Sequence, residues 1–461
     1  MKHVFFIFVS LYFGLALNVF ALTESTQIDS TQINQIIQKR GLSREHLGIE
    51  ISIGSKKVFT LNESKKFIPA SVTKIVTSYT ILKQMPINYK FKTELFYDGK
   101  NIYIKGGGDP SFVSENMWYL VNEFTRLNIK SIKDIIVDDT LFDQVRYDQS
   151  RESVRVDRSY DAPIGAMSFN WNSINIFVKP AQLNQKANVY LDPENQYFKL
   201  VNKAQTNDNK SAKELVIDIN QEQKIITVSG DVHSKIDEKA YFKNVSDPAM
   251  WTAENLKSFL NQRGIVTTGQ LRTGTVPLDA QKMATSESKS INQILIDMNK
   301  FSNNFVAEML TKNLAAFSGE RPAKLSTGVE QIRNELKEIG LTEKDMYIEN
   351  PSGFSRDNKF TARGLNKVLE VIQNDFQIFP GFVESLPILG IDGTLKKRMK
   401  NSPITGLVRA KTGYLDGVIA LAGYAGKANG DILHFSFLYN GPRDMKLVQE
   451  TFDQILVQIL K

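Results

Sequence analysis

Residues 69–82 have the sequence Pro-Ala-Ser-Val-Thr-Lys-Ile-Val-Thr-Ser-Tyr-Thr-Ile-Leu, and this stretch decides the fold. Apolar residues follow Ser71 at the spacing of one helix face, which predicts a helix whose buried side is made of Ile75, Val76, Tyr79 and Leu82. Positions i and i+3 share a helix face, so Lys74 is expected beside the Ser71 hydroxyl. A lysine whose pKa is lowered by burial or by a nearby cation can take the proton of a hydroxyl. The stretch therefore predicts a serine nucleophile with a lysine base.

The Ser-x-x-Lys pattern is weak by itself. Ser71 has a second interpretation as the N-cap of the helix, and residues 286–289 match the same pattern without an apolar helix after them. The free backbone N–H groups at a helix start also stabilise a developing oxyanion, as acyl transfer requires. The position of Ser71 suits both interpretations, so other motifs must separate them.

The composition excludes several other ways to activate a nucleophile. The 461 residues include no cysteine, which excludes thiol nucleophiles, thiolate metal sites and disulfides. With four histidines and no His-Glu-x-x-His pattern, no zinc peptidase and no other metal or organic cofactor is expected. A Ser-His-Asp triad would need His46, His233 or His434, none of which lies in a recognisable catalytic motif. The scattered net charge of +7 argues against nucleic acid as a partner but allows weak attraction to a membrane surface.

The N-terminus has the pattern of a secretory signal peptide. Lys2 and His3 precede an apolar run over residues 4–17, and residues 19–21 (Val-Phe-Ala) suit cleavage after Ala21. An uncleaved N-terminal anchor is the alternative, whereas a lipoprotein anchor would need a cysteine. We therefore expect residues 1–21 to be removed and the protein to be exported to the periplasm, or outside the cell if the source lacks an outer membrane.

The remaining chain divides by its patterns into three stretches. Residues 22–90 and 285–461 mix amphipathic helices with alternating strands, whereas residues 91–284 alternate short β-like runs with turns. We expect an α/β fold in which the two outer stretches form one discontinuous domain, an antiparallel sheet flanked by helices. The β-rich insertion of residues 91–284 is expected to form two small domains, the inner one near residues 155–240.

Two further motifs lie in the last of these stretches. Residues 302–304 (Ser-Asn-Asn) precede an apolar helix, and residues 411–413 (Lys-Thr-Gly) lie on a predicted strand and occur once in the chain. Ser-x-Asn also occurs at residues 168–170, 173–175 and 290–292; we select Ser302 for the apolar helix that follows it. A Ser-x-x-Lys, a serine–asparagine motif and Lys-Thr-Gly, in this order, are the signature shared by penicillin-binding proteins and class A β-lactamases.

Within that group the chain resembles the penicillin-binding protein 4 type of D-alanyl-D-alanine carboxypeptidase/endopeptidase, peptidase family S13. That type has insert domains after the nucleophile helix, which matches the long interval between Ser71 and Ser302. Further segments similar to the family, in the same order, are residues 106–110, 160–163, 165–170, 351–358 and 386–395. The resemblance implies a β-lactamase/transpeptidase-like domain with a two-part insertion, and a Lys-Thr-Gly strand at the sheet edge facing the Ser71 helix.

The resemblance also implies the catalytic roles. Ser71 is the nucleophile, and Lys74 is the base that takes its proton. Ser302 relays protons to the leaving group, and Asn304 binds the substrate backbone. Lys411 supplies positive charge near Ser302 and the substrate carboxylate. From the chemistry of the motifs we further expect both Ser302 and Asn304 to hold the Lys74 amine by hydrogen bonds.

The substrate-binding residues that the resemblance implies lie around the same strand. Thr412, Gly413 and Tyr414 line the substrate side, and the backbone N–H groups of the nucleophile and of Tyr414 form the oxyanion hole. Arg356 corresponds to an arginine that meets the stem-peptide side chain. Two positions depart from the family: Tyr414 replaces the usual Ser or Thr, whose hydroxyl helps hold the terminal carboxylate, and Asn170 stands where some relatives carry an acidic residue.

The expected function is a serine D-Ala-D-Ala carboxypeptidase, a D,D-endopeptidase, or both, acting on peptidoglycan stem peptides through a Ser71 acyl-enzyme. β-Lactam antibiotics are then expected as covalent inhibitors. Two alternatives remain open from the residues: a β-lactamase or D-amino-acid esterase on the same fold, and a non-catalytic cell-wall scaffold that keeps the motifs. The residues do not separate carboxypeptidase from endopeptidase action or determine an oligomeric state.

Overall fold

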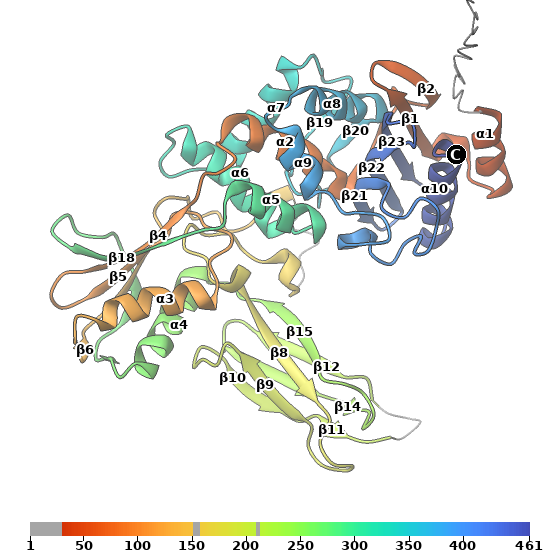
Figure 1. Ribbon diagram of the computed structural model, residues 1–461. Coiled ribbons are helices and arrows are strands. Elements are labelled where there is room, and N and C mark those ends of the chain that lie inside the picture. Colours follow the sequence, from red (N-terminus) through yellow and green to blue (C-terminus); the bar gives the residue numbers. More distant parts are fainter. Residues whose placement is uncertain (1–29, 151–156, 209–212) are drawn as a thin grey trace, which may run out of the picture.

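The computed structural model describes residues 30–150, 157–208 and 213–461. The predicted signal peptide, residues 1–21, lies outside the described residues. Within these ranges no helix is both long enough and apolar enough to cross a membrane. Figure 1 shows an α/β body formed by the two ends of the chain, and two smaller parts formed by the sequence between them.

The body is organised around a five-stranded sheet in the order β2-β1-β23-β22-β21. Every neighbouring pair in it is antiparallel, and β1 pairs with β23 so that Leu47 lies opposite Tyr439. The strands are β1 (Leu47–Ile53), β2 (Lys56–Leu61), β21 (Val408–Leu415), β22 (Val418–Gly426) and β23 (Ile432–Asn440). The predicted discontinuous α/β domain is thus confirmed, and β21, which carries the Lys-Thr-Gly motif, is an edge strand.

Helices cover both faces of this sheet. On one face α1 (Ser30–Lys39) and α10 (Met445–Ile459) share an apolar cluster with the sheet. The other face carries a bundle made of α2 (Lys74–Gln84), α5 (Ile291–Lys300), α6 (Asn304–Phe317), α7 (Leu325–Glu338), α8 (Ala362–Asn374) and α9 (Phe379–Ser385). A small sheet of β3 (Lys66–Phe67), β20 (Lys359–Thr361) and β19 (Met346–Tyr347) lies beside the bundle.

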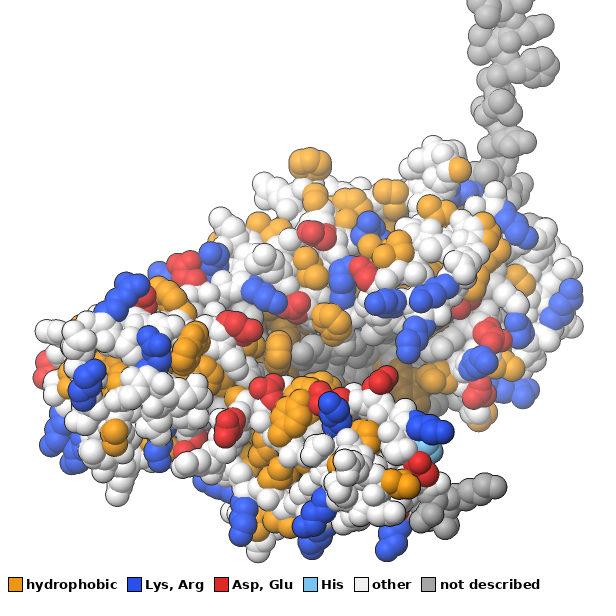
Figure 2. Space-filling view, turned by 60° about the horizontal axis from the view of Figure 1, so that its bottom comes forward, with side chains coloured by type: hydrophobic (Ala, Val, Ile, Leu, Met, Phe, Trp, Pro, Cys, Tyr) orange, Lys and Arg blue, Asp and Glu red, His pale blue; other side chains and the backbone are white. Residues whose placement is uncertain are grey.

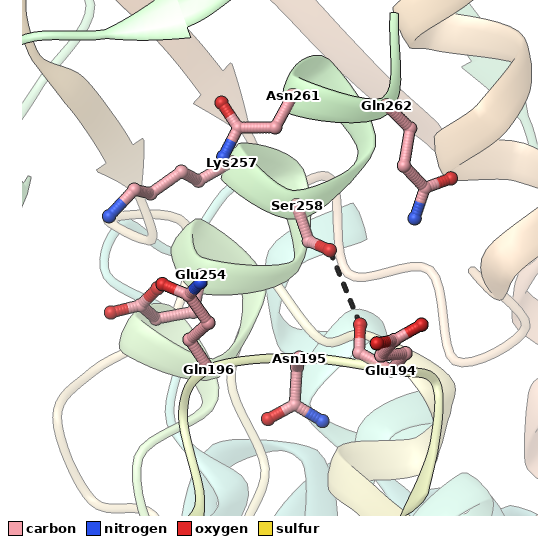
Figure 3. A pocket seen from close by; sticks show the side chains of 8 residues that line it. All are labelled: Glu194, Asn195, Gln196, Glu254, Lys257, Ser258, Asn261 and Gln262. Atoms are coloured by element: carbon pink, nitrogen blue, oxygen red, sulfur yellow. Dashed lines mark hydrogen bonds between the residues drawn. The ribbon is translucent and has the colours of Figure 1, made fainter.

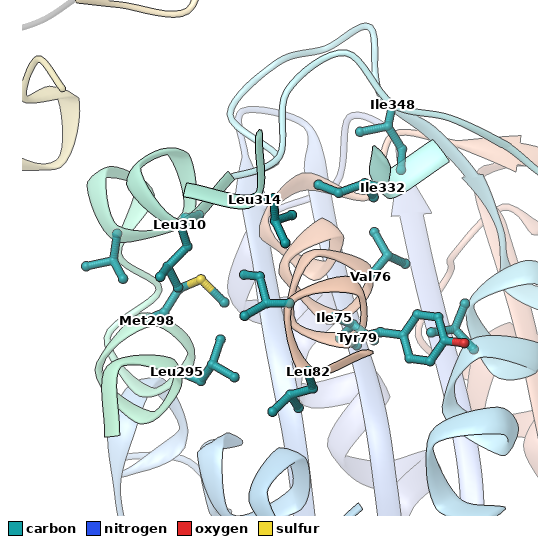
Figure 4. Close-up of a cluster of buried hydrophobic side chains, with 14 of the residues drawn as sticks. Ile75, Val76, Tyr79, Leu82, Leu295, Met298, Leu310, Leu314, Ile332 and Ile348 are labelled. Atoms are coloured by element: carbon teal, nitrogen blue, oxygen red, sulfur yellow. The ribbon is translucent and has the colours of Figure 1, made fainter. Parts of the chain in front are cut away.

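Helix α2 is the centre of the bundle. Figure 4 shows side chains of α2 meeting others from the neighbouring helices: Ile75, Val76, Tyr79 and Leu82 against Leu295, Met298, Leu310, Leu314 and Ile332. The sequence predicted one buried side, but all side chains from Lys74 to Leu82 are buried. The polar members are accommodated because their hydroxyls bond carbonyls one turn earlier, as Ser78 Oγ does with the Lys74 oxygen at 2.7 Å.

The first part of the insertion is a five-stranded sheet covered by two helices. Its order is β17-β7-β5-β4-β18, with bounds Leu271–Thr273, Ile135–Asp138, Ile102–Lys105, Lys92–Tyr97 and Gln281–Glu287. The helices α3 (Ser114–Thr125) and α4 (Pro248–Gln262) were missed by the strand-and-turn interpretation of this region. For α4 the start signals were present, since Asp247 accepts a bond from the Met250 N–H and Pro248 occupies the first turn. The two-strand pair β6 (Ser131–Ile132) and β16 (Val266–Thr267) lies at its edge.

In the residues that the structure describes, the second, inner part is built from short strands (Figure 1). One sheet has the order β15-β8-β9, with bounds Lys239–Asn244, Ser173–Lys179 and Asn188–Asp192. The others are β10-β13-β12 (Lys199–Asn202, Ile225–Ser229, Val216–Asn220) and β11-β14 (Gln205–Thr206, Asp231–Val232). Trp251 of α4 is fully buried against Tyr197 and Phe198, so the inner part shares its core with the first. The expected two-part, β-rich insertion is thus confirmed.

The insertion leaves and re-enters the body at one point. Strands β4 and β18 pair antiparallel, and the backbones of Phe91 and Ser288 are joined by a 2.9 Å bond from the Ser288 N–H to the Phe91 oxygen. The loops that follow β7 also reach the body, since Phe142, Ala162 and Ala166 belong to the apolar cluster around α2. The insertion therefore supports the bundle and is not a free appendage.

We predict that stability depends on the α2 core. Ile75→Ala removes a fully buried side chain and should lower the free energy of unfolding by about 2–5 kcal/mol, because the bundle cannot close around the cavity. Leu278→Ala, at a fully exposed position, should change it by less than about 0.5 kcal/mol. Urea denaturation followed by circular dichroism is the suitable measurement, since all three tryptophans lie in the insertion. Equal midpoints for the two variants would contradict this role of α2.

Candidate active site

The turn that presents Ser71 is clamped between two segments. Ser71 lies in a 3₁₀ turn, Ala70–Thr73, directly before α2, and Ala70 has a left-handed φ of 48°, which is costly for a residue with a side chain. A Cβ on Gly413 would lie 2.6 Å from the Pro69 oxygen, and one on Gly353 would lie 2.0 Å from the Ala70 oxygen. Glycine is therefore required on both sides, and the close approach of β21 explains the glycine of Lys-Thr-Gly.

Lys74 connects Ser71 to two other segments. Its Nζ lies 3.1 Å from Ser71 Oγ, 2.7 Å from Asn304 Oδ1 and 2.6 Å from the Ser352 backbone oxygen. A neutral amine has two N–H groups and one lone pair. In this neutral form the lone pair can receive the hydroxyl proton of Ser71, which lies within hydrogen-bond distance. The geometry therefore suits a lysine that takes the proton of the serine.

The second motif serves two different atoms. Asn304 is the first residue of α6 and bonds Lys74, whereas Asn303 caps the helix by accepting the Val306 N–H at 3.2 Å. Ser302 has a left-handed φ of 56°, and its Oγ accepts a 2.8 Å bond from Lys411. Of the two side chains expected at Lys74, the structure shows Asn304 bonded to it, and it shows Ser302 bonded to Lys411. The turn before α6 directs the Ser302 hydroxyl to this lysine on β21.

Lys411 is fully buried on β21. Its Nζ donates to Ser302 Oγ and, at 2.9 Å, to the Thr412 backbone oxygen, both of which are neutral acceptors. Burial lowers the pKa of Lys411 from 10.5 to about 7, because the cation loses its hydration. The group can therefore gain or lose a proton near neutral pH, next to a serine hydroxyl.

A loop behind Lys74 supplies the Ser352 oxygen and is held by buried polar side chains. Asn350 Oδ1 accepts the backbone N–H groups of Ser352 and Phe354, at 3.0 and 3.1 Å. Glu308, one turn after Asn304 on α6, accepts 3.2 Å bonds from Asn350 Nδ2 and Ser352 Oγ. Sequence reasoning did not single out Glu308 or Asn350, although a glutamate inside the apolar helix sequence was a usable signal.

A further hydrogen bond joins this loop to the insertion. Asn350 Nδ2 also donates to Asp148, which lies in the segment after β7. Asn358 closes the loop, since its Oδ1 accepts the N–H groups of Glu349 and Asn350 at 2.8 and 2.9 Å. The loop that positions the Lys74 amine is thus braced by α6, by its own asparagines and by the insertion.

The predicted substrate-binding residues are only partly gathered. Thr412 and the half-exposed Tyr414 lie on β21, and Thr412 Oγ1 is 2.8 Å from Thr394 Oγ1. Arg356 donates to the Asp416 oxygen at 2.6 Å, which places it at the end of β21. Asn170 instead lies in the insertion, where its side chain bonds the backbone and the hydroxyl of Ser114 at the start of α3. No hydrogen bond among the described residues joins Asn170 to the other predicted site residues.

One aromatic contact near the loop was also missed from the sequence. Tyr160, from the insertion, packs edge-on against Phe354 with ring centroids 5.8 Å apart. Its hydroxyl-bearing ring is half exposed. The insertion thus contributes a side chain beside the loop that carries Arg356.

A polar hollow lies apart from the three motifs, between α4 and residues 194–196. It has a volume of about 370 Å³ and is lined by Glu194, Asn195, Gln196, Glu254, Lys257, Ser258, Asn261 and Gln262 (Figure 3). None of these residues belongs to the three motifs. In the described ranges, no cluster of three or more histidine, aspartate or glutamate side chains has the arrangement of a metal site.

Comparison with known proteins relates the whole chain to one family. Residues 29–460 match the profile of the D-Ala-D-Ala carboxypeptidase 3 (S13) family. A D-alanyl-D-alanine carboxypeptidase of Actinomadura sp. (strain R39) is 28% identical over 414 residues, which is 84% of this chain and 76% of that protein. D-alanyl-D-alanine carboxypeptidase DacB of Haemophilus influenzae is 26% identical, covering 86% of this chain and 85% of its own.

The fold is similar to a solved structure as well. Penicillin-binding protein 4 (dacB) of Haemophilus influenzae superposes with a TM-score of 0.78 at 23% identity, over 93% of this chain and 97% of that one. A structure of the same protein in complex with a β-lactam superposes with a TM-score of 0.75. The β-lactamase/transpeptidase-like fold with its insertion is thus shared.

We predict that Lys411 destabilises the fold near neutral pH. Because the pKa of Lys411 is lower in the folded protein, the unfolded chain binds more protons between pH 7 and 10.5. The destabilisation caused by burying Lys411 therefore decreases as the pH rises through that range. Lys411→Met should therefore raise the free energy of unfolding by about 2–4 kcal/mol at pH 7, and by progressively less toward pH 10.5. Lys100→Met, at an exposed position, is the control and should show no such trend. A pH-independent effect of Lys411→Met in urea denaturation would contradict the burial argument.

Proposed function

Because the chain belongs to the D-Ala-D-Ala carboxypeptidase 3 (S13) family, we propose that it is a serine D-Ala-D-Ala carboxypeptidase and D,D-endopeptidase of peptidoglycan stem peptides. The observation that carries the proposal is the 3.1 Å contact between Lys74 Nζ and Ser71 Oγ at the start of a buried helix. It supplies a nucleophile and a base without cysteine, histidine or metal.

Acylation begins with the attack of Ser71 Oγ on the carbonyl of the penultimate D-alanine. The serine proton passes to the Lys74 amine as the C–O bond forms, and the backbone N–H groups of Ser71 and Tyr414 stabilise the oxyanion. When the C–N bond breaks, the departing D-alanine amine takes a proton from Ser302. Lys411, whose pKa is near 7 and which bonds Ser302 at 2.8 Å, returns that proton.

Hydrolysis follows when water adds to the acyl carbonyl and the bond to Ser71 Oγ breaks. Ser71 Oγ takes back the proton held by Lys74, and the carboxylic acid of the shortened stem peptide gives its proton to Lys411. The second proton of the water passes to solvent. The same two steps cleave a D-Ala–diaminopimelate cross-link, in which the leaving amine belongs to a second stem peptide. The amide of Asn304 has two functions in this mechanism. Its Oδ1 accepts a 2.7 Å bond from Lys74 Nζ, and its Nδ2 donates to a carbonyl of the substrate. The site needs no cofactor for either reaction.

β-Lactams acylate the same serine, because their strained amide presents a carbonyl that Ser71 attacks and a leaving nitrogen that stays attached. The complex of the Haemophilus influenzae protein with a β-lactam supports this part of the proposal. The protein acts outside the cytoplasm, where peptidoglycan lies, and the signal-peptide pattern of residues 1–21 directs its export to the periplasm.

The nucleophile is tested by the mass of the intact protein after brief exposure to penicillin. The wild-type protein should gain one penicillin mass on the peptide that contains Ser71, and Ser71→Ala should gain none while keeping its circular dichroism spectrum. An adduct on Ser71→Ala would transfer the role to another serine, and Ser286 would be examined next. If the protein instead hydrolysed penicillin faster than it released D-alanine from an N-acyl-D-Ala-D-Ala peptide, the result would favour a β-lactamase.

The base is tested by comparing lysine and histidine variants. Lys74→Ala should lower the second-order rate of acylation by a fluorescent penicillin about 10²–10⁴-fold, because no group replaces the lost proton acceptor. The double variant His46→Gln, His233→Gln should stay within a few-fold of wild type. His434 is buried against Tyr424 and bonds Gln373, so it is left in place to preserve the fold. A fast Lys74→Ala protein, or an inactive double histidine variant, would refute the lysine mechanism.

A further inference from the structure

Strand β21 lacks a short hydroxyl at one position that faces the substrate. Side chains two residues apart lie on the same side of a strand, so Tyr414 shares its face with Thr412. The resemblance described above implies a Ser or Thr at the position of Tyr414, with a hydroxyl that would help hold the terminal carboxylate. The tyrosine is 56% exposed and carries its hydroxyl at the far end of a ring. On this face of β21, the Tyr414 side chain therefore places no hydroxyl close to the backbone next to Thr412.

A hydroxyl from another segment lies at this point instead. Thr394 belongs to a 3₁₀ turn, Gly393–Leu395, and its Oγ1 is 2.8 Å from Thr412 Oγ1. Each hydroxyl has one proton, and in the free protein one of them donates to the other. When a carboxylate binds, the two hydroxyls can each donate a hydrogen bond to one of its two oxygens.

The turn that carries Thr394 is firmly placed. Residues 387–389 run along the free edge of β21, since the Ala410 N–H donates to the Pro387 oxygen and the Leu389 N–H to the Val408 oxygen, both at 3.0 Å. Their register with β21 is fixed by a bridge between Ile388 and the strand. The backbone that leads to Thr394 is therefore an extension of the sheet.

The start of the turn is bonded to Lys300, which lies two residues before Ser302. Asp392 accepts the Ile388 N–H at 2.8 Å and pairs with Lys300 Nζ at 2.6 Å, at the end of α5. Gly393 has a φ of 55°, and a Cβ there would lie 2.8 Å from the Lys300 oxygen. Thr394 thus needs little ordering when a ligand binds, since its turn is already locked against the chain that leads to Ser302.

We propose that Thr394 is a substrate-binding residue that, together with Thr412, holds the terminal carboxylate of the substrate in place of the hydroxyl missing at Tyr414. The inference rests on the proposed function, because it assigns the carboxylate of a D-Ala-D-Ala peptide, or the equivalent carboxylate of a penicillin, to this pair. Lys411 lies behind the pair and bonds the Thr412 backbone oxygen, so a positive charge is near the anion.

The test compares ligands with and without the carboxylate. Second-order acylation rates of a penicillin and of its methyl ester are measured by intact mass for wild type, Thr394→Val and Thr394→Ser. Thr394→Val keeps the shape but removes the hydroxyl, and it should slow acylation by the acid about 10- to 100-fold, with the ester changed less than about 3-fold. Thr394→Ser keeps the hydroxyl and should remain near wild type with both ligands.

A second-site variant separates recognition from damage to the site. If Thr394 replaces the missing hydroxyl, Tyr414→Ser added to Thr394→Val should restore most of the preference for the acid. Equal loss with acid and ester in Thr394→Val, or no loss with either, would overturn the inference, as would a failure of Tyr414→Ser to rescue. Wild-type protein that is acylated by neither ligand and releases no D-alanine would contradict the proposed function itself.

Discussion

The hydrogen bonds of the buried Lys74 amine are the constraint on which the rest of the structure depends. A buried amine must have partners, and this one bonds the turn before α2, the first residue of α6 and the loop that contains Ser352. These segments lie far apart in the sequence, so the amine is satisfied only when the whole bundle has formed. The catalytic geometry and the core are therefore the same assembly, with α2 buried on every side.

The two buried lysines of the candidate site, Lys74 and Lys411, have different surroundings. Lys74 Nζ contacts Ser71 Oγ and two carbonyl-type oxygens, those of the Asn304 side chain and the Ser352 backbone. Lys411 has only a hydroxyl and a backbone oxygen, and burial brings its pKa to about 7. In the proposed mechanism Lys74 receives the proton of Ser71, and Lys411 supplies a proton or a charge on the leaving-group side, next to Ser302. The stability lost by burying Lys411 is the physical cost of having an exchangeable cation there.

The insertion takes part in the site although it interrupts the domain that contains it. Its two ends pair as β4 and β18, so its length does not disturb the bundle. Phe142 and Ala166 join the apolar cluster around α2, and Asp148 bonds the asparagine that organises the Ser352 loop. Tyr160 lies beside the same loop. The insertion therefore supports the loop that bonds the Lys74 amine.

The sequence by itself determined the fold class, the three motifs and the choice of Ser71, because local spacing decides which side chains share a helix turn or a strand face. It also predicted that one site contains Ser71, Lys74, Ser302, Asn304 and Lys411. It missed α3 and α4, and it did not foresee that the side chain of Asn170 bonds Ser114 at the start of α3. Glu308, Asn350 and Thr394 emerged only from the tertiary structure. Each of them has a partner between 18 and 202 residues away. The direction of a left-handed turn and the approach of a sheet edge are decided by long-range packing, which no local pattern encodes.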